Sequence, residues 1–222
     1  MARRFLRSLS ITLVAIATLV LAPAGAGAVG RTSDILRLDD FPTGWEASPV
    51  LPSDDDAPTT PACDALAHQQ RKSIDTIGTP KFVDPSAPSE HNVVAASVTR
   101  MPSPRAARQQ VAALLKPRLF QCLIDGTNAR FDSEHGGGKA STVVHEIRIP
   151  HADAHVHALR AKTRISGVAG FEYTQQVVFV QDGRRIVTLH VDTEDSADYT
   201  ALRNRLVPLI QKRLRDGGAL HV

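Results

Sequence analysis

Four strand-like segments, rich in apolar and β-branched residues, lie in the C-terminal half of the chain. The four segments follow one another closely and span residues 142–149, 155–165, 171–181 and 185–193. Asp182 and Gly183 separate the last two, and this dipeptide is a strong signal for a tight hairpin. Because short connections cannot join parallel strands, we expect these strands to pair in an antiparallel sheet.

Three other segments show the apolar spacing of amphipathic helices. They span residues 63–77, 103–124 and 196–214, and a fifth strand over residues 92–101 lies between the first two. Ser103 followed by Pro104 favours a helix start, because serine caps a helix and proline is pre-set for the first turn. Pro117 and Pro208 should each kink the helix that contains them.

The last helix is expected to begin at a Ser196 cap and to bury one apolar stripe. This stripe consists of Tyr199, Leu202, Leu206, Ile210 and Leu214. Helices packed on an antiparallel sheet define an α+β domain. We therefore predict a single α+β domain over residues 63–222, with about five strands and three helices.

Residues 29–62 form an N-terminal extension and loop in this interpretation. A turn over residues 41–45 should bring Trp45, the only tryptophan, against the body of the domain. The acidic run at residues 54–56 lacks the alternating spacing of a calcium loop, so it indicates a solvated loop.

Residues 1–28 have the three parts of a secretory signal peptide. Three arginines come first, an apolar run spans residues 11–21, and small residues end at Ala26-Gly27-Ala28. The apolar run is shorter than the roughly 20 residues that a membrane-spanning helix needs. We expect cleavage after Ala28, no stable membrane anchor afterwards, and a secreted or cell-envelope location.

Cleavage changes the charge of the protein. The leader holds three of the 26 basic residues and none of the 23 acidic ones, so 23 of each sign remain. An electroneutral mature chain lacks the clustered positive field that nucleic-acid binding needs. We therefore expect no nucleic-acid partner.

The mature chain has two cysteines, Cys63 and Cys122. In an exported protein, an isolated pair most simply forms a disulfide. Each lies on the apolar side of its expected helix, so the bond would join two helices at the core. A metal or redox pair is the alternative, although the chain has neither a C-x-x-C spacing nor a histidine adjacent to a cysteine.

Four histidines lie close together in the chain and raise the possibility of a metal site. They are His145, His151, His155 and His157, and imidazole is a ligand for zinc, copper and nickel. A pair at positions 155 and 157 of one strand would project to the same side and could instead be half-buried at a sheet edge. The sequence assigns no metal ligand, cofactor-binding residue or catalytic residue.

Other motifs are weaker. The segment His135-Gly136-Gly137-Gly138 lacks the remaining residues of a phosphate loop, and no G-x-S-x-G motif accompanies it to indicate an esterase. Tyr173, Gln175 and Gln176 lie on an otherwise apolar strand, where they line a polar pocket or face solvent.

Several of these features together resemble a family of secreted sensor-type domains of actinobacteria. The resemblance rests on residues 35–45, on Cys63 opening a helix, and on Met101-Pro102-Ser103 leading to a helix that bears Cys122. The family includes the extracellular domain of a mycobacterial serine/threonine kinase and related exported lipoproteins. It implies a PsbP-like sandwich, a curved antiparallel sheet with a cleft that binds a ligand without catalysis.

The chain departs from this family in having one cysteine pair where the kinase sensor has two, and in lacking a kinase domain and a lipid-anchor cysteine. The expected function is an exported, non-enzymatic, sensor-like domain that binds a small molecule or a cell-envelope partner. The alternatives are a secreted hydrolase whose catalytic residues meet only in the fold, and a metal-binding protein that uses the histidine cluster.

Overall fold

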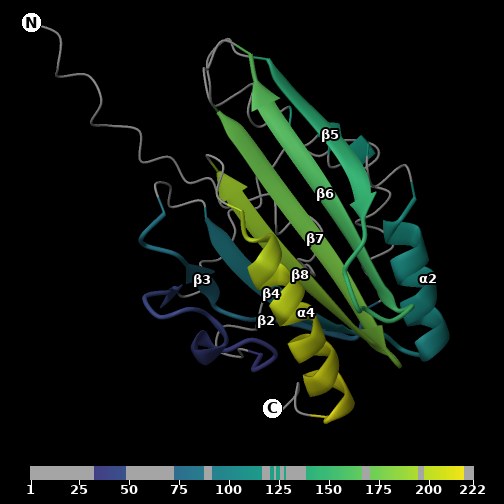
Figure 1. Ribbon diagram of the computed structural model, residues 1–222. Coiled ribbons are helices and arrows are strands. Elements are labelled where there is room, and N and C mark those ends of the chain that lie inside the picture. The colour runs from purple at the N-terminus through teal and green to yellow at the C-terminus, as the bar shows by residue number, and fades with distance from the viewer. Residues whose placement is uncertain are drawn as a thin grey trace, which may run out of the picture.

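One antiparallel sheet organises the protein (Figure 1). The computed structural model describes residues 33–48, 73–87, 92–116, 121–122, 124–125, 128, 139–166, 171–194 and 198–217. Eight strands occur in this part of the chain: β1 (Glu46–Ser48), β2 (Asp75–Gly78), β3 (Lys81–Val83), β4 (Val93–Arg100), β5 (Ala140–Ile147), β6 (Val156–Ile165), β7 (Glu172–Asp182) and β8 (Arg185–Glu194). Their order in the sheet is β1-β3-β4-β8-β7-β6-β5, with β2 also paired to β4.

The four strands expected in the C-terminal half are confirmed as β5 to β8, and the expected strand over residues 92–101 is confirmed as β4. All strand pairs are antiparallel, as the short connections require. Strand β8 lies between β4 and β7, at the centre of the sheet. Gly183, which follows β7, has a φ of 56°, the left-handed conformation that glycine adopts without strain.

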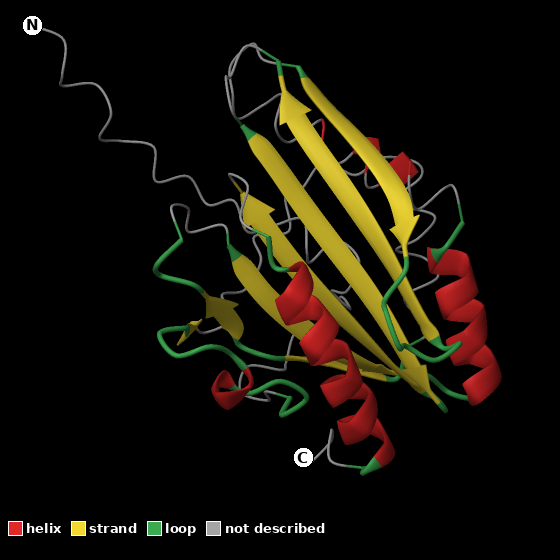
Figure 2. Ribbon diagram, in the orientation of Figure 1, coloured by secondary structure: helices red, strands yellow, loops and turns green. Residues whose placement is uncertain are grey.

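Helix α4 (Thr200–Arg215) packs on one face of the sheet, the face turned toward the viewer in Figure 2. The helix buries Leu206, Ile210 and Leu214 completely, at the three- and four-residue spacing of one helix face. Beneath it lie Val178 and Leu189 from the two central strands. The apolar stripe predicted for this helix is therefore confirmed.

Helix α2 (Pro104–Leu114) packs on the opposite face of the sheet. Its buried residues contact Val177 and Phe179, the neighbours of the strand residues that face α4. The start of this helix is as predicted: the Ser103 hydroxyl accepts a hydrogen bond from the Ala106 amide at 3.1 Å. The sheet is thus covered by a helix on each side, so the described part of the chain is an α+β fold.

Three expectations about the helices are wrong. Helix α2 ends at Leu114, and residues 121–122 and 124–125 are helical again, so the expected helix over 103–124 is interrupted before Pro117 rather than continuous. Residues Asp75–Gly78, expected at the end of the first helix, form strand β2 instead, with Ile77 opposite Val98. Helix α4 begins at Thr200 after Tyr199, whereas Ser196 was expected to cap it.

The numbers of elements also differ from the prediction. Eight strands and two α-helices replace the expected five strands and three helices in the described part of the chain. Strands β1 and β3 have three residues each, too few for an alternating pattern to be recognised in the sequence.

The residues before β1 are attached to α4 through aromatic packing. Phe41 stacks between Trp45 and Phe82, with ring centroids 4.9 and 4.2 Å apart, and Trp45 contacts Tyr199 at 5.3 Å. Tyr199 in turn donates a hydrogen bond to Asp84 at 3.0 Å. The turn that places Trp45 against the domain is therefore confirmed.

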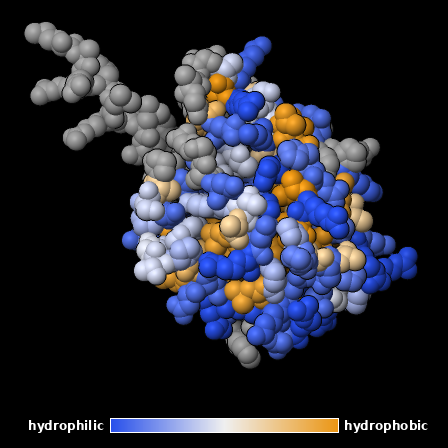
Figure 3. Space-filling view, in the orientation of Figure 1, coloured by the Kyte–Doolittle hydropathy of each residue, from blue (hydrophilic) through white to orange (hydrophobic). Residues whose placement is uncertain are grey.

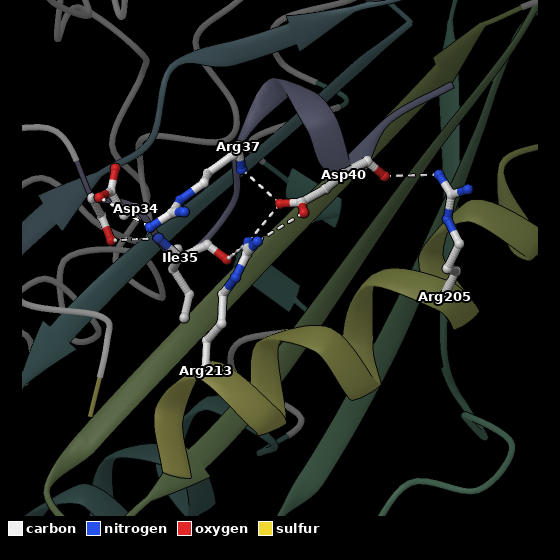
Figure 4. Close-up of polar contacts among 7 residues, drawn as sticks. Asp34, Ile35, Arg37, Asp40, Arg205 and Arg213 are labelled. Atoms are coloured by element: carbon white, nitrogen blue, oxygen red, sulfur yellow. Dashed lines mark hydrogen bonds and ion pairs between the residues drawn. The ribbon is translucent and has the colours of Figure 1, made fainter. Parts of the chain in front are cut away.

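An ion pair joins the residues before β1 to the last turn of α4 (Figure 4). The Arg213 guanidinium donates two hydrogen bonds to the Asp40 carboxylate, at 2.5 and 2.8 Å, and a third to the Ile35 carbonyl. Asp40 also accepts a bond from the Arg37 amide, and its carbonyl accepts one from Arg205. The Asp40 side chain is only 8% exposed, so the pair is largely removed from water.

Several predicted features lie outside the described residues. These are the leader at 1–28, Cys63, the acidic run at 54–56, and the glycine-rich segment at 135–138. Cys122 is buried against the α2 side of the sheet, and no described cysteine is free. The Cys63–Cys122 disulfide stays a prediction. None of the helices in the described segments has the length and apolar character to span a bilayer.

Candidate functional site: a polar pocket beside helix α4

A pocket of about 370 Å³ lies on the α4 face of the sheet, next to the first turn of that helix. This size falls in the range of small-molecule sites, which is roughly 300–1,000 Å³. We call it the α4-face pocket. Its lining comes from β6, β7, β8 and the start of α4, and consists of Arg160, Lys162, Glu172, Thr174, Gln176, Thr193, Asp198 and Thr200.

The pocket exists because the α4 face of the sheet changes from apolar to polar along each strand. On β7, Val178 lies under α4, whereas Gln176 and Thr174 point to the same side beyond the start of the helix. Strand register aligns the polar residues, since Arg160 lies opposite Gln176 and Thr174 lies opposite Thr193. The floor of the pocket is therefore the polar part of the same sheet face whose apolar part lies under α4.

Hydrogen bonds at the start of α4 connect the helix to the pocket. The Thr200 amide donates to the Asp198 carboxylate at 2.9 Å, and the Thr200 hydroxyl donates to the same carboxylate. Arg160 donates from Nη2 to the Thr200 hydroxyl oxygen at 3.4 Å. The Thr200 hydroxyl therefore contacts both Arg160 and Asp198.

A second set of polar contacts joins β6 to β7 beside the pocket. Glu172 forms ion pairs with Lys162 at 2.7 Å and with Arg164 at 3.2 Å. The hydrogen bond from Lys162 lowers the pKa of Glu172 below its ordinary value, and the bond from Arg164 adds to the effect. Hydrogen bonds from Thr200 likewise lower the pKa of Asp198, with help from the charges of Arg160 and Arg203. Both carboxylates are therefore ionised at neutral pH.

Arg203 lies behind the pocket, one turn into α4, and is only 3% exposed. It donates hydrogen bonds to the side-chain oxygens of Gln176, which lines the pocket, and of Asn204. Burial lowers the pKa of Arg203, and the neighbouring charge of Arg160 lowers it further.

The α4 side of the molecule has a mixed, largely hydrophilic surface (Figure 3). In the view of Figure 3, hydrophilic residues cover much of the α4 side, and the hydrophobic residues are scattered among them. The large hydrophobic side chains exposed in the described part of the chain, Leu38, Ile74 and Val143, lie apart in the sequence and do not line the pocket.

Comparisons with known proteins give the chain no family. No protein-family model matches it, and no curated protein matches its sequence. Among solved structures it is similar to the extracellular domain of PknH from Mycobacterium tuberculosis, at 15% identity and a TM-score of 0.40, over 76% of this chain and 82% of that one. It is also similar to PsbP from the cyanobacterium Synechocystis sp. PCC 6803, at 12% identity and a TM-score of 0.42, over 86% of this chain and 97% of that one.

These two structures are of the kinds that the sequence resemblance named. Their TM-scores are below 0.5, so the similarity is distant. The actinobacterial origin stays a prediction.

The histidine cluster is not assembled into a metal site. His145 on β5 lies opposite Arg160 and faces the α4 side, whereas His157 on β6 lies opposite Phe179 and faces the α2 side. His155 precedes β6 and is exposed in a turn, so the expected same-side pair at positions 155 and 157 does not form. The described residues contain no group of three potential ligands placed to hold a metal ion.

The three polar residues noted on β7 do not all lie on the same face of the sheet. Gln176 lines the α4-face pocket, as the pocket interpretation predicted, while Gln175 and Tyr173 face the α2 side. All three are at most 3% exposed, so the alternative of a solvent face is wrong.

The α2 side contains a buried histidine that the sequence did not reveal. His190 on β8 is 4% exposed, and neither ring nitrogen has a hydrogen-bond partner. Burial lowers its pKa to about 4, so the ring is neutral at neutral pH. Ser97 on the adjacent strand also has a buried hydroxyl without a partner, so these two side chains do not form a nucleophile–base pair.

Proposed function

We propose that this protein is an exported, non-enzymatic binding domain that holds a small polar molecule in the α4-face pocket. The observation that carries the proposal is the pocket itself, a cavity of small-molecule size lined by side chains from three strands and one helix. Its polar groups come from rigid elements, so they are in place before a ligand arrives.

The state of the two pocket carboxylates argues against catalysis. A glycosidase-like mechanism needs one carboxyl group with a raised pKa, so that it can serve as a general acid near neutral pH. Glu172 and Asp198 both have lowered pKa values, and each is already hydrogen-bonded. The described lining residues include neither a histidine nor a serine, so among them there is no Ser–His pair for acyl transfer.

Export rests on the sequence of residues 1–28, with a basic start, an apolar middle and small residues before the cleavage site. A secreted product whose N-terminus is Val29 would support this part of the proposal. Detection of Met1 in the secreted protein, or retention of the whole product in the cytoplasm, would overturn it.

The binding function is tested by thermal unfolding of the purified protein against a panel of small acids, amines, sugars and amino acids. A ligand at 100 times its dissociation constant stabilises the native state by about 2.7 kcal/mol. For a chain of this size, we expect a rise in the unfolding midpoint of roughly 5 to 10 °C.

Two variants show whether a rise in the unfolding midpoint comes from binding in the pocket. Thr174→Tyr fills the pocket and should abolish the shift, because Thr174 is part of the lining. Gln109→Tyr adds a bulky side chain at an exposed position of α2 and should leave the shift unchanged. If no member of the panel raises the midpoint, or if Thr174→Tyr responds like the native protein, the proposed function is wrong.

A further inference from the structure

The residues around the α4-face pocket have an excess of positive charge. Four cations, Arg160, Lys162, Arg164 and Arg203, face two carboxylates, Glu172 and Asp198. Glu172 is occupied by ion pairs to Lys162 and Arg164. Asp198 is therefore the one pocket carboxylate left near the two remaining guanidinium groups, and it interacts with both through charge alone.

Neither of these guanidinium groups has a carboxylate in direct contact. No ion pair within 4.0 Å joins Arg160 or Arg203 to an acidic residue in the described segments. The hydrogen bonds of Arg203 go to neutral amide oxygens of Gln176 and Asn204. A buried cation without a counterion is costly, because burial removes the water that would stabilise it.

Arg160, which lines the pocket, has an unused hydrogen-bond donor. Its Nη2 donates to the Thr200 hydroxyl, but its Nε is buried and has no hydrogen-bond partner. A guanidinium offers its donors in a planar fork that matches the two oxygens of a carboxylate or phosphate group. Helix α4 begins at Thr200, and the positive end of its dipole there also favours a negatively charged group.

We propose that the ligand of the α4-face pocket carries an oxyanion, a carboxylate or phosphate group, which Arg160 binds directly. Arg203 acts from behind as a positioning residue, since it holds Gln176 at the pocket floor and adds buried positive charge. The inference rests on the proposed function and deepens it, because it names the chemical class of the ligand.

The test measures the binding of inorganic phosphate and of succinate to the full purified protein by titration calorimetry and by Trp45 fluorescence. Trp45 contacts Tyr199, which lies between the pocket residues Asp198 and Thr200, so its emission should respond to occupancy. Sodium chloride holds the ionic strength constant, so that general screening cannot imitate binding. The two probes separate phosphate from carboxylate preference.

We expect saturable binding of at least one probe, and at least a tenfold rise in its dissociation constant in Arg160→Gln. Arg108→Gln is the matched control, because Arg108 is exposed on α2 on the opposite face. It should bind like the native protein. The midpoint of thermal unfolding of each variant shows that it is folded, and Arg160→Lys should recover only part of the affinity, since lysine lacks the planar fork.

Two outcomes overturn the inference. The first is that neither probe binds saturably, and the second is that Arg160→Gln binds as tightly as the native protein. If a neutral or cationic member of the panel still binds in a way that Thr174→Tyr abolishes, the proposed function stands and only the oxyanion is wrong. If no compound of any charge binds, both proposals fail.

Discussion

His190 should make the protein less stable as the pH falls below 7. The ring is buried at the centre of the sheet, between Ala95 on β4 and Val177 on β7. Desolvation alone accounts for its lowered pKa, which moves from 6.5 to about 4. In the unfolded chain the ring regains its ordinary pKa, so the unfolded state binds a proton at a pH where the native state does not.

The direction and size of the effect follow from this difference. Because the pKa of His190 is lower in the native state, its neutral form contributes full stability above about pH 6.5. That contribution is lost as the pH falls from about 6.5 to about 4. A shift of this size corresponds to about 3 kcal/mol in total, of which about 2 kcal/mol is lost by pH 5. The unfolding midpoint should then fall by roughly 4 to 8 °C between pH 7 and pH 5.

Carboxylates do not account for a loss of stability in this interval. Asp84, Glu172 and Asp198 have pKa values lowered from ordinary values near 4. Their stabilising contributions are therefore lost as the pH falls below about 4, outside the range measured.

The assays are thermal unfolding and urea denaturation at pH 7, 6 and 5, both followed by Trp45 fluorescence. His190→Leu should remove most of the pH dependence between 7 and 5, and should cost little stability at pH 7. It replaces two buried nitrogens that lack partners with an apolar side chain of similar size. His155→Leu changes an exposed histidine and should keep the native pH dependence. If His190→Leu loses stability with pH as steeply as the native protein, the reasoning is refuted.

Three further predictions concern stability. Asp40→Asn should lower the free energy of unfolding by about 3 kcal/mol in urea denaturation, because it leaves the partly buried Arg213 without its counterion; a loss below about 0.5 kcal/mol would contradict this. Gly183→Ala should cost about 1 kcal/mol from backbone strain alone, since φ is 56° and no atom lies within 4 Å of the added Cβ; unchanged stability would show that the strain is absent. Reduction of the predicted Cys63–Cys122 disulfide should cost about 4 kcal/mol, and peptide mapping without reductant that finds two free thiols would disprove the bond.

The sequence predicted the strands of the sheet better than its helices. β5 to β8 were recognisable because each is a strand-like run of eight or more residues, and the Asp182-Gly183 turn separates the last two. The start of α2 was predictable from two adjacent residues, Ser103 and Pro104, whose roles are local. Local signals of this kind do not depend on the rest of the fold.

The errors arose where local pattern and tertiary pairing disagree. Ile74 and Ile77 have a helical spacing relative to the apolar residues before them, but Thr76 and Ile77 are β-branched and pair with β4. The Thr76 hydroxyl lies 3.1 Å from that of Thr99 across the two strands. A partner strand more than twenty residues away decided the structure, and periodicity within one segment carries no information about such a partner.

The pocket could not be predicted from the sequence for a related reason. Arg160, Lys162 and Thr193 each occupy a polar position in an alternating strand, where a solvent-facing residue is the ordinary expectation. Only the register of β6, β7 and β8 brings them together, and only the start of α4 adds Asp198 and Thr200. His190 was equally hidden, because it occupies a polar position of β8 between Thr188 and Asp192, where a solvent-facing residue is again the ordinary expectation.

One sequence feature nevertheless marks the edge of the pocket. Along β7, the residues that face α4 are apolar at Val180 and Val178 and become polar at Gln176 and Thr174. A two-residue alternation keeps all four on one side of the sheet, so the change in polarity shows where the helix stops covering that side. Because burying a polar side chain without a partner costs free energy, the hydrogen bond that Arg203 donates from α4 stabilises the buried Gln176. That same contact brings a buried positive charge to the pocket, so the requirement that completes the core also produces the electrostatics on which the proposed anion site depends.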